Sequence, residues 1–253
     1  MLEINNLTAA YGDRIVLDRV SAAIPAKQVT AILGPNGCGK STLLKTVCGI
    51  LKASDGEILL DGENLLTAPQ RVLAQKIAYL SQSRQIPDIT AERLVLHGRF
   101  PYMSYPRRYR PQDHAAAKAA MAQMAIEDLA SVPVDQLSGG QRQKVYIAMA
   151  LAQDTPVILL DEPTTYLDIR HQLQMMRQAR ALSDRGKTVV MVVHDIAHAM
   201  ITADRIILMD QGRVAAQGTP ETIFDCGMID KVFGVKLGRV QTGSGWQYYC
   251  EEG

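Results

Sequence analysis

Three features of the sequence predict an α/β fold with a mostly parallel central sheet. Four short runs rich in β-branched and aliphatic residues are typical of buried strands: 28–33, 157–160, 189–193 and 206–209. Helix-like stretches at 41–50 and 169–183 lie between some of these runs, and strands that alternate with helices imply a parallel sheet. Between residues 86 and 150 the strand signals fade, and Ala-rich stretches such as 115–125 indicate helices. That region is the candidate for a helical subdomain.

The other predicted elements are shorter. Further short strands are expected at 57–60, at 77–80 and, with turns between them, within 2–33. A turn at residues 210–213 predicts a hairpin near the end of the sheet. Beyond Thr219-Pro220 we expect a short helix and then an irregular strand over residues 240–250.

The composition is typical of a folded globular chain. Apolar residues make up 47% of the 253 residues, whereas disordered chains have far less. A formal net charge of +1 supplies no overall basic field, so no nucleic-acid partner is expected. No apolar run approaches the ~18 residues of a membrane span, and the N-terminus has no signal-peptide pattern, so we expect a cytoplasmic location. Four widely spaced cysteines are predicted to be free thiols: Cys38, Cys48, Cys226 and Cys250.

A glycine-rich loop follows the first of the four strands. Gly34-Pro35-Asn36-Gly37-Cys38-Gly39-Lys40-Ser41 matches G-x-x-x-x-G-K-[ST], between a predicted strand and a predicted helix. Glycines let backbone N–H groups point at phosphate oxygens, and the helix N-terminus favours negative charge. Lys40 can supply a charge to the β and γ phosphates, and Ser41 a hydroxyl to Mg²⁺. Because of this context we prefer a nucleotide site, extending to Thr42, over a plain glycine-rich turn.

Two carboxylates end the predicted strand at 157–160. Asp161 would hold Mg²⁺ through water, since ligands bind at the carboxyl ends of strands in such sheets. Glu162 could accept a proton from the attacking water or polarise it. The alternative, a charged strand end facing solvent, is less attractive once the phosphate loop is present. Together the two motifs indicate a P-loop nucleotide hydrolase or kinase.

The segment Leu137-Ser138-Gly139-Gly140-Gln141 indicates which class of P-loop protein this is, because LSGGQ is the signature of ABC (ATP-binding cassette) proteins. The chain resembles the ATP-binding subunits of ABC transporters over essentially its whole length. The signature has a physical account as well. Its glycines allow phosphate to approach the backbone where a helix begins, over about residues 141–153, and the helix N-terminus favours negative charge.

Other motifs of that family occur in the expected order. Tyr11 matches the aromatic residue that stacks on adenine, Gln82 the glutamine of the Q-loop, and His194 the switch histidine. Asp168, in Thr165-Tyr166-Leu167-Asp168, matches the D-loop at the dimer interface. Taken singly, a turn tyrosine, a strand-end glutamine or a lone histidine is usually structural or solvated. Their occurrence together and in order supports the assignment.

The resemblance implies how the chain is organised and what it binds. It implies one ABC ATPase domain over residues 1–253, with 1–85 and 151–253 as a RecA-like core with an antiparallel β subdomain, and 86–150 as a helical signature subdomain. ATP and Mg²⁺ are the implied cofactors, with Ser41, Gln82 and, through water, Asp161 as metal ligands. It also implies a homodimer in which ATP lies between Lys40 of one copy and Ser138, Gly139, Gly140 and Gln141 of the other.

The segment after Gln82 indicates a subfamily within the ABC transporter ATP-binding subunits. Gly98-Arg99-Phe100-Pro101 looks like the subfamily that drives importers of iron-siderophores, haem and cobalamin. The implied partners are integral membrane permease subunits and, indirectly, a periplasmic or lipoprotein binding protein, with the chain on the cytoplasmic face of the membrane. A cassette of another metal or oxyanion importer, an exporter cassette, and a soluble ABC mechanoenzyme stay as alternatives.

Three smaller features of the sequence lead to expectations of their own. Cys38 lies between Gly37 and Gly39 of the loop, and the adjacent helix start and Lys40 are expected to lower its pKa. The hypothesis is that alkylation of Cys38 blocks ATP binding and that ATP protects it. The basic run 107–110 is interpreted as a solvated face, with a permease, lipid headgroups or nucleic acid as alternatives. Met175 and Met176 are expected to fill the core.

Overall fold

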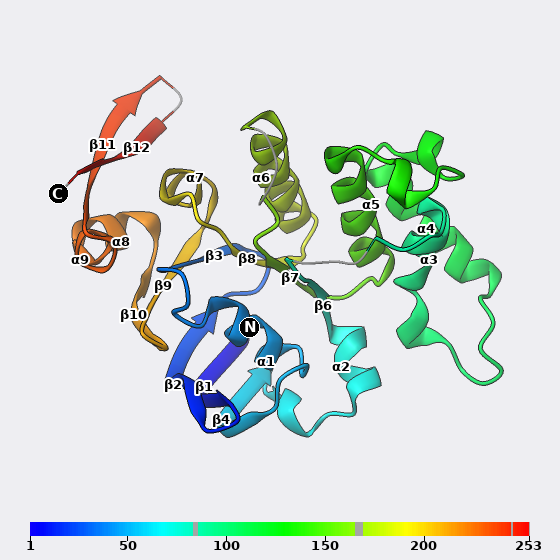
Figure 1. Cartoon of the computed structure of the whole chain (residues 1–253), viewed down its shortest axis with the longest axis horizontal. Coiled ribbons are helices and arrows are strands. Elements are labelled where there is room, and N and C mark those ends of the chain that lie inside the picture. Colours follow the sequence, from blue (N-terminus) through cyan, green and yellow to red (C-terminus); the bar gives the residue numbers. More distant parts are fainter. Residues whose placement is uncertain (83–85, 165–168, 244, 253) are drawn as a thin grey trace.

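The computed structural model describes residues 1–253 except 83–85, 165–168, 244 and 253. Its central sheet has the strand order β10-β9-β3-β8-β7-β6 (Figure 1). The strands are β3 (Val29–Leu33), β6 (Ile77–Leu80), β7 (Val157–Asp161), β8 (Thr188–Val192), β9 (Arg205–Asp210) and β10 (Arg213–Gly218). All neighbours are parallel except the β9–β10 hairpin, so the predicted parallel sheet and its closing turn are confirmed.

A second, antiparallel sheet contains most of the N-terminal region, in the order β2-β1-β4-β5. Its strands are β1 (Leu2–Tyr11), β2 (Arg14–Ile24), β4 (Ala53–Leu60) and β5 (Glu63–Asn64). The expectation of several short strands here was wrong, because β1 and β2 have ten and eleven residues. Register shifts interrupt their pairing, and Asn6 and Arg19 adopt positive φ. Such bulges break the period-two pattern from which a long strand is recognised.

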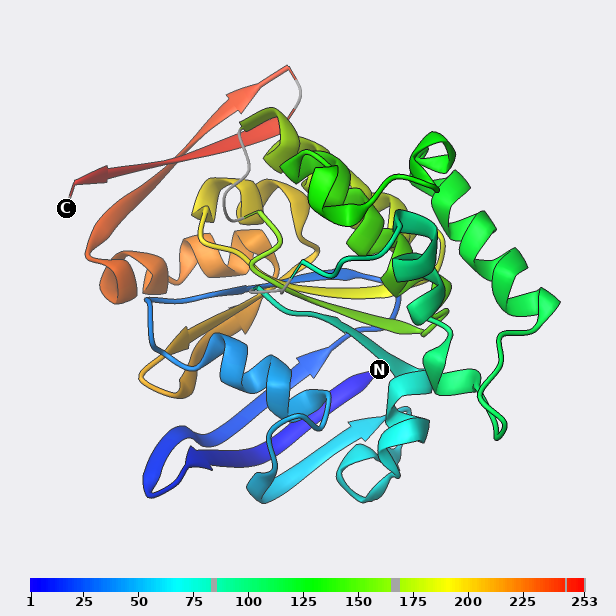
Figure 2. The ribbon, with the colours of Figure 1, turned by 45° about the vertical axis from the view of Figure 1, so that its right-hand side comes forward.

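Helices cover both faces of the central sheet. They are α1 (Lys40–Val47), α2 (Gln70–Lys76), α3 (Ala91–His97), α4 (Pro111–Gln123), α5 (Gly139–Ala152), α6 (Ile169–Asp184), α7 (Ile196–Thr202), α8 (Pro220–Asp225) and α9 (Met228–Phe233). Short 3₁₀ turns lie at Leu65–Thr67, Phe100–Tyr102, Glu127–Leu129 and Val134–Gln136. Helices α3, α4 and α5 form a group at one end of the molecule (Figure 2). No helix in the described part of the chain has the length and apolarity that crossing a membrane requires.

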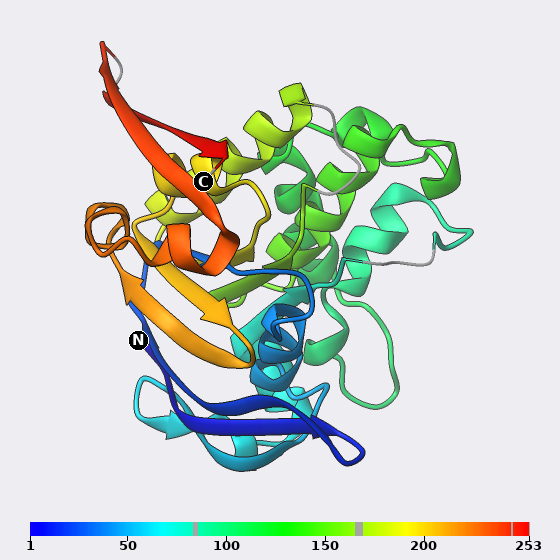
Figure 3. The same ribbon diagram turned by 60° about the vertical axis from the view of Figure 1, so that its left-hand side comes forward.

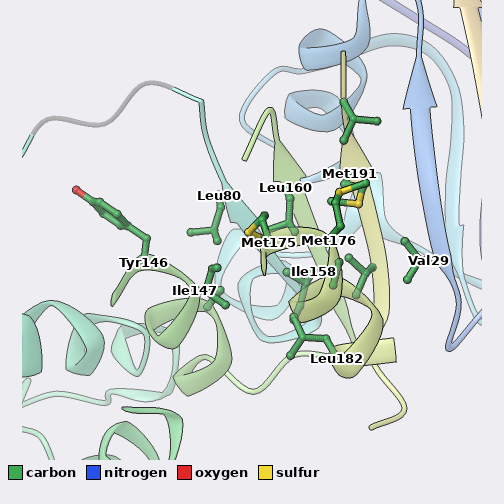
Figure 4. Packing of buried hydrophobic residues seen from close by; sticks show 14 of the residues in the cluster. Val29, Leu80, Tyr146, Ile147, Ile158, Leu160, Met175, Met176, Leu182 and Met191 are labelled. Atoms are coloured by element: carbon green, nitrogen blue, oxygen red, sulfur yellow. The ribbon is translucent and has the colours of Figure 1, made fainter. Parts of the chain in front are cut away.

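The core consists of two clusters on opposite faces of the central sheet. Alternate residues of β7 separate them, with Ile158 and Leu160 in one cluster and Val157 and Leu159 in the other. The first cluster includes α3 to α7, and the second joins α1 to the antiparallel sheet. Figure 4 shows Met175 and Met176 of α6 packed near Leu80 and Leu160. Both methionines are buried, so their predicted role as core residues is confirmed.

An ion pair inside the helical group ties α3 to α4 and α5. Nε of Arg99 donates to Oδ1 of Asp113 at 3.1 Å, and its Nη1 donates to the Ala152 carbonyl oxygen at 2.9 Å. Asp113 is buried. A Cβ on Gly98 would stand 2.2 Å from the carbonyl oxygen of Met149, so only glycine permits this approach of α3 to α5.

The C-terminal segment forms a hairpin, not the irregular strand that was expected. Strands β11 (Val235–Thr242) and β12 (Gly245–Glu252) pair antiparallel and project from the body beyond α8 and α9 (Figure 3). The Tyr249 ring covers Gly238, where a Cβ would lie 2.4 Å from Cζ of the ring. A glycine and polar residues at this contact weaken the sequence signal for a strand.

Candidate nucleotide site

The site is built at one edge of the central sheet. The neighbouring strands β3, β8, β7 and β6 are parallel, so their carboxyl ends lie together. The residues that follow them are therefore brought to one edge: the loop from Gly34 after β3, Gln82 after β6, Glu162 after β7 and His194 after β8. This is the edge at which ligands bind in such sheets.

The glycine-rich loop turns sharply between β3 and α1. Gly34 and Gly39 have φ of 154° and 105°, a region that favours glycine. A Cβ on Gly34 would stand 2.3 Å from the carbonyl oxygen of Met209, so the loop is pressed against β9. Its far side is held by the Gly212 N–H, which donates to the Cys38 carbonyl oxygen at 3.1 Å. Contacts with β9 and with Gly212 thus help to set the shape of the loop.

Lys40 is buried at the start of α1. Its Nζ donates to the carbonyl oxygens of Gly34 at 2.8 Å and Pro35 at 3.0 Å. An ammonium group has three donors, so one donor beyond these two bonds is available to an anion. The loop opens into a cavity of about 150 Å³. Its lining residues are Val16, Asn36, Gly37, Gly39, Lys40, Ser41, Thr42 and Glu162.

The carboxylate of Asp161 is the centre of the second part of the site. It accepts a 2.8 Å hydrogen bond at Oδ1 from the Ser41 hydroxyl and a 2.9 Å bond at Oδ2 from the Tyr79 hydroxyl. Asp161 is only 2% exposed. A hydroxyl next to a carboxylate is an all-oxygen donor set, which suits a hard cation such as Mg²⁺ that keeps several waters. Among the described residues no group of three or more His, Cys, Asp or Glu is arranged to hold a metal.

Glu162 lies between Gln82 and His194. Nε2 of Gln82 donates to Oε2 of Glu162, and Nε2 of His194 lies 2.7 Å from Oε1. Glu162 adopts a φ of 49°, uncommon for a residue with a side chain. Its side chain is 11% exposed, whereas that of His194 is 46% exposed. The structure therefore brings together the three residues predicted to be catalytic, with Glu162 also lining the cavity beside Lys40.

The structure corrects the expectation for Cys38. The side chain is buried, and burial raises the pKa of the Cys38 thiol, although Lys40 acts in the opposite direction. The expected lowering by Lys40 and the helix start was therefore wrong, because desolvation of a thiolate outweighs one neighbouring cation.

Two residues at the site were not predicted from the sequence. Val16 of β2 lines the cavity, and the Tyr79 hydroxyl reaches Asp161. Neither belongs to a recognisable chemical motif, so only their strand positions could have indicated them. Tyr11, the predicted adenine contact, is 49% exposed at the end of β1 and is not among the residues that line the cavity.

The signature segment lies apart from this cavity. Ser138 caps α5: its hydroxyl accepts from the Gln141 N–H at 3.3 Å, and its own N–H donates to Gln141 Oε1 at 3.0 Å. Helix α5 packs in the core cluster opposite the one that contains α1. None of Ser138, Gly139, Gly140 and Gln141 lines the cavity. Asp168 lies outside the residues that the structure describes.

These features define a P-loop nucleotide-binding protein. The glycine-rich loop after β3 leads to the buried Lys40, and the adjacent Ser41 donates a hydrogen bond to Asp161 at the end of β7. The chain belongs to the ABC transporter family, whose model matches residues 17–165. The predicted family and fold class are thus confirmed, and the chain is an ATPase cassette.

Known proteins similar to this chain include two named cassettes. The chain is 38% identical to the probable siderophore transport system ATP-binding protein YusV of Bacillus subtilis, over 92% of this chain and 85% of that protein. It is 40% identical to the ferric enterobactin transport ATP-binding protein FepC of Escherichia coli, over 91% of this chain and 86% of that protein.

Solved structures of other ABC transporter cassettes have the same fold as this chain. A chain of an inward-facing, metal-chelate type ABC transporter superposes with a TM-score of 0.85 at 26% identity, covering 98% of this chain and 95% of that one. A dimeric bacterial ABC transporter cassette superposes with a TM-score of 0.75 at 32% identity, covering 87% and 99%.

Proposed function

We propose that this cassette uses ATP hydrolysis to power a membrane importer whose cargo is an iron-siderophore, with haem and cobalamin as chemically related alternatives. The main support for ATP hydrolysis is the position of Glu162. It is held by Gln82 and His194 at the cavity that Lys40 and Ser41 also line. The cargo is inferred from the two relatives named for siderophore and ferric enterobactin transport.

In this proposal the phosphates of ATP occupy the loop from Gly34 to Thr42. Lys40 contacts the β and γ phosphates, and Tyr11 stacks on adenine. Ser41, Gln82 and, through water, Asp161 hold Mg²⁺, which supplies charge neutralisation of the phosphates when bound. The Ser41–Asp161 hydrogen bond of 2.8 Å supports the metal assignment, because the hydroxyl and the carboxylate already face one another.

Glu162 then acts on the attacking water. A carboxylate so placed can accept the proton as the water attacks, a contribution of about 10²–10⁴ in rate. Gln82 and His194 bind its two oxygens and thus orient it. Both Gln82 and His194 must release or share Glu162 when water and the γ-phosphate enter.

The proposal requires two copies of the chain. The signature residues 138–141 start a helix on the face of the sheet opposite α1, which begins at Lys40. Ser138 and Gly139 are exposed, as expected for residues that meet a partner. A twofold dimer would then place them on the ATP of the other copy, with Asp168 at the interface. The dimeric cassette at 32% identity supports this arrangement.

The permease would dock beside α2. An apolar groove of about 460 Å³ lies between α2 and the 3₁₀ turn Phe100–Tyr102. This turn belongs to the segment that follows Gln82 in the sequence. Its lining residues are Gln70, Arg71, Ala74, Phe100, Pro101, Met103, Tyr105 and Arg107. Such a groove suits a short helix of a membrane subunit. The chain would then sit peripherally on the cytoplasmic face of the membrane and meet a binding protein only indirectly.

Reconstitution with the permease encoded beside the gene tests this function. The complex is placed in vesicles with ATP on the cassette side, and movement of a radiolabelled ferric siderophore is followed. Uptake towards the cassette side is expected, and Glu162→Gln should lower both hydrolysis and transport by at least about 10²-fold. ATP-driven movement in the opposite direction, or transport of another metal or oxyanion alone, would favour the alternatives. A cassette that binds no permease would contradict the proposal.

A further inference from the structure

Tyr79 contacts the predicted metal site although no motif assigns it a role. It lies in β6, and the parallel register pairs Tyr79 with Leu159 of β7. Asp161 ends β7 two residues further on, and the phenolic hydroxyl of Tyr79 reaches its Oδ2 at 2.9 Å. The ring is partly buried against the core cluster that contains Leu159. Tyr79 is therefore fixed by the sheet at both its backbone and its ring.

The carboxylate of Asp161 is held by a different donor on each oxygen. Ser41 donates to Oδ1 at 2.8 Å and Tyr79 donates to Oδ2 at 2.9 Å. The terminal torsion of an aspartate is soft, so one donor alone would leave the plane of the carboxylate free to rotate. With Oδ2 bound to Tyr79, Oδ1 faces Ser41 at the start of α1.

We propose that Tyr79 is a positioning residue for the metal–nucleotide site, whose hydroxyl fixes the Asp161 carboxylate in the orientation that meets Ser41 and the bound cation. This inference rests on the proposed role of Ser41 and Asp161 in holding Mg²⁺. Outer hydrogen-bond partners of metal-binding groups typically change metal affinity by 10–100-fold when removed. Because Asp161 is expected to act through water, the lower end of that range applies.

The chemistry of Tyr79 suits a permanent donor. An ordinary tyrosine hydroxyl loses its proton only at about pH 10, so at neutral pH it is a hydrogen-bond donor. Replacement by Phe removes the hydroxyl and keeps the ring that packs in the core, so Tyr79→Phe isolates the hydrogen bond.

The test measures binding of a fluorescent, non-hydrolysable ATP analogue, first in EDTA and then at rising Mg²⁺ concentration. For Tyr79→Phe we expect affinity in EDTA within about twofold of the original chain. We expect the Mg²⁺ concentration that gives half of the metal-dependent gain in affinity to rise about tenfold. In an Asp161→Asn background the same change should have no further effect on the Mg²⁺ dependence, because Asn lacks the negative charge through which Asp161 would hold the cation.

Tyr102→Phe is the matched control. The Tyr102 hydroxyl is likewise a partly buried phenol, but it donates to the Gln153 carbonyl oxygen at 2.9 Å and not to Asp161. Its Mg²⁺ dependence should not change. An unchanged Mg²⁺ dependence in Tyr79→Phe, an equal loss of affinity in EDTA, or an effect that persists with Asp161→Asn would overturn the positioning role. If the unmodified chain itself gains nothing from Mg²⁺, the proposed metal site fails and this role with it.

Discussion

Cys38 and Lys40 lie two positions apart where the loop meets α1, yet the environment of each differs from what their closeness in the chain suggests. The ammonium of Lys40 donates to two carbonyl oxygens, so two of its three N–H donors are already used within the loop. The Cys38 thiol is buried, and removal from water disfavours its thiolate more than Lys40 favours it. Reactivity at this position is therefore governed by burial.

This leads to a prediction for thiol labelling. With iodoacetamide at pH 8, we expect Cys226, which is exposed, to be modified at least about tenfold faster than the buried Cys38. Because the pKa of Cys38 is raised, its rate should continue to climb as the pH increases beyond 8. Mass spectrometry of tryptic peptides over time measures both rates.

Bound nucleotide should slow Cys38 further while leaving Cys226 unchanged, and labelling in denaturant should abolish the difference. Labelling of Cys38 as fast as Cys226 in the folded chain would contradict the role of burial. The separate hypothesis that alkylation of Cys38 blocks ATP binding stays a prediction.

At the scale of elements, the Gly98-Arg99 pair that suggested a subfamily has a structural role. Gly98 lets α3 approach Met149 of α5, and Arg99 joins Asp113 of α4 to the end of α5. Burial alone would raise the pKa of Asp113, but hydrogen bonds from the Arg110 backbone and from Arg99 hold it below its usual value. The ion pair therefore fixes the helices that carry the signature segment.

Asp113→Asn should destabilise the fold by about 3 kcal/mol at pH 7, because it leaves Arg99 without its buried counter-ion. Chemical denaturation of both chains measures the difference. Because the native pKa of Asp113 is lowered, its contribution is fully present above the unfolded value of about 3.9 and is lost only as the pH falls through the native value. The difference between the two chains should thus stay constant from pH 7 to about pH 5.

Asp128→Asn, at an exposed position in the same region, is the control and should change stability by no more than about 0.5 kcal/mol. Equal stabilities of the Asp113→Asn and unmodified chains would show that the ion pair contributes nothing to the helical group.

At the scale of the whole molecule, the two helix starts that are proposed to bind phosphate lie in different core clusters. Lys40 begins α1 on one face of the central sheet, and Ser138 caps α5 on the other. The central sheet lies between the two clusters, which argues against one chain bringing both helix starts to one nucleotide. Completion of the site by a second copy is the arrangement that this geometry favours.

Disulfide trapping tests that arrangement. Asn36 and Ser138, both exposed, are replaced by cysteine in a chain that carries Glu162→Gln and serine at Cys226 and Cys250. We expect ATP with Mg²⁺ to give a covalent dimer on a non-reducing gel under mild oxidation, and neither single-cysteine variant to give one. A disulfide within one chain, or a dimer band that does not depend on ATP, would contradict the proposed sandwich.

The sequence by itself determined the local parts of the site. The glycine loop, Lys40 and Ser41 depend on residues close in the chain, and a strand–loop–helix context is readable from a short window. Strand-end positions also placed Asp161, Glu162, Gln82 and His194 at one edge, since parallel strands end together. The match to the motifs of the family then gave each of these residues an expected role.

Only the tertiary structure decided the remainder. The contact between Tyr79 and Asp161 joins residues 82 positions apart and depends on the register of β6 against β7. The raised pKa of Cys38 and the bulged pairing of β1 with β2 likewise depend on what packs against what. Desolvation, register and the face of a sheet are properties of distant neighbours, and no local pattern of residues encodes them.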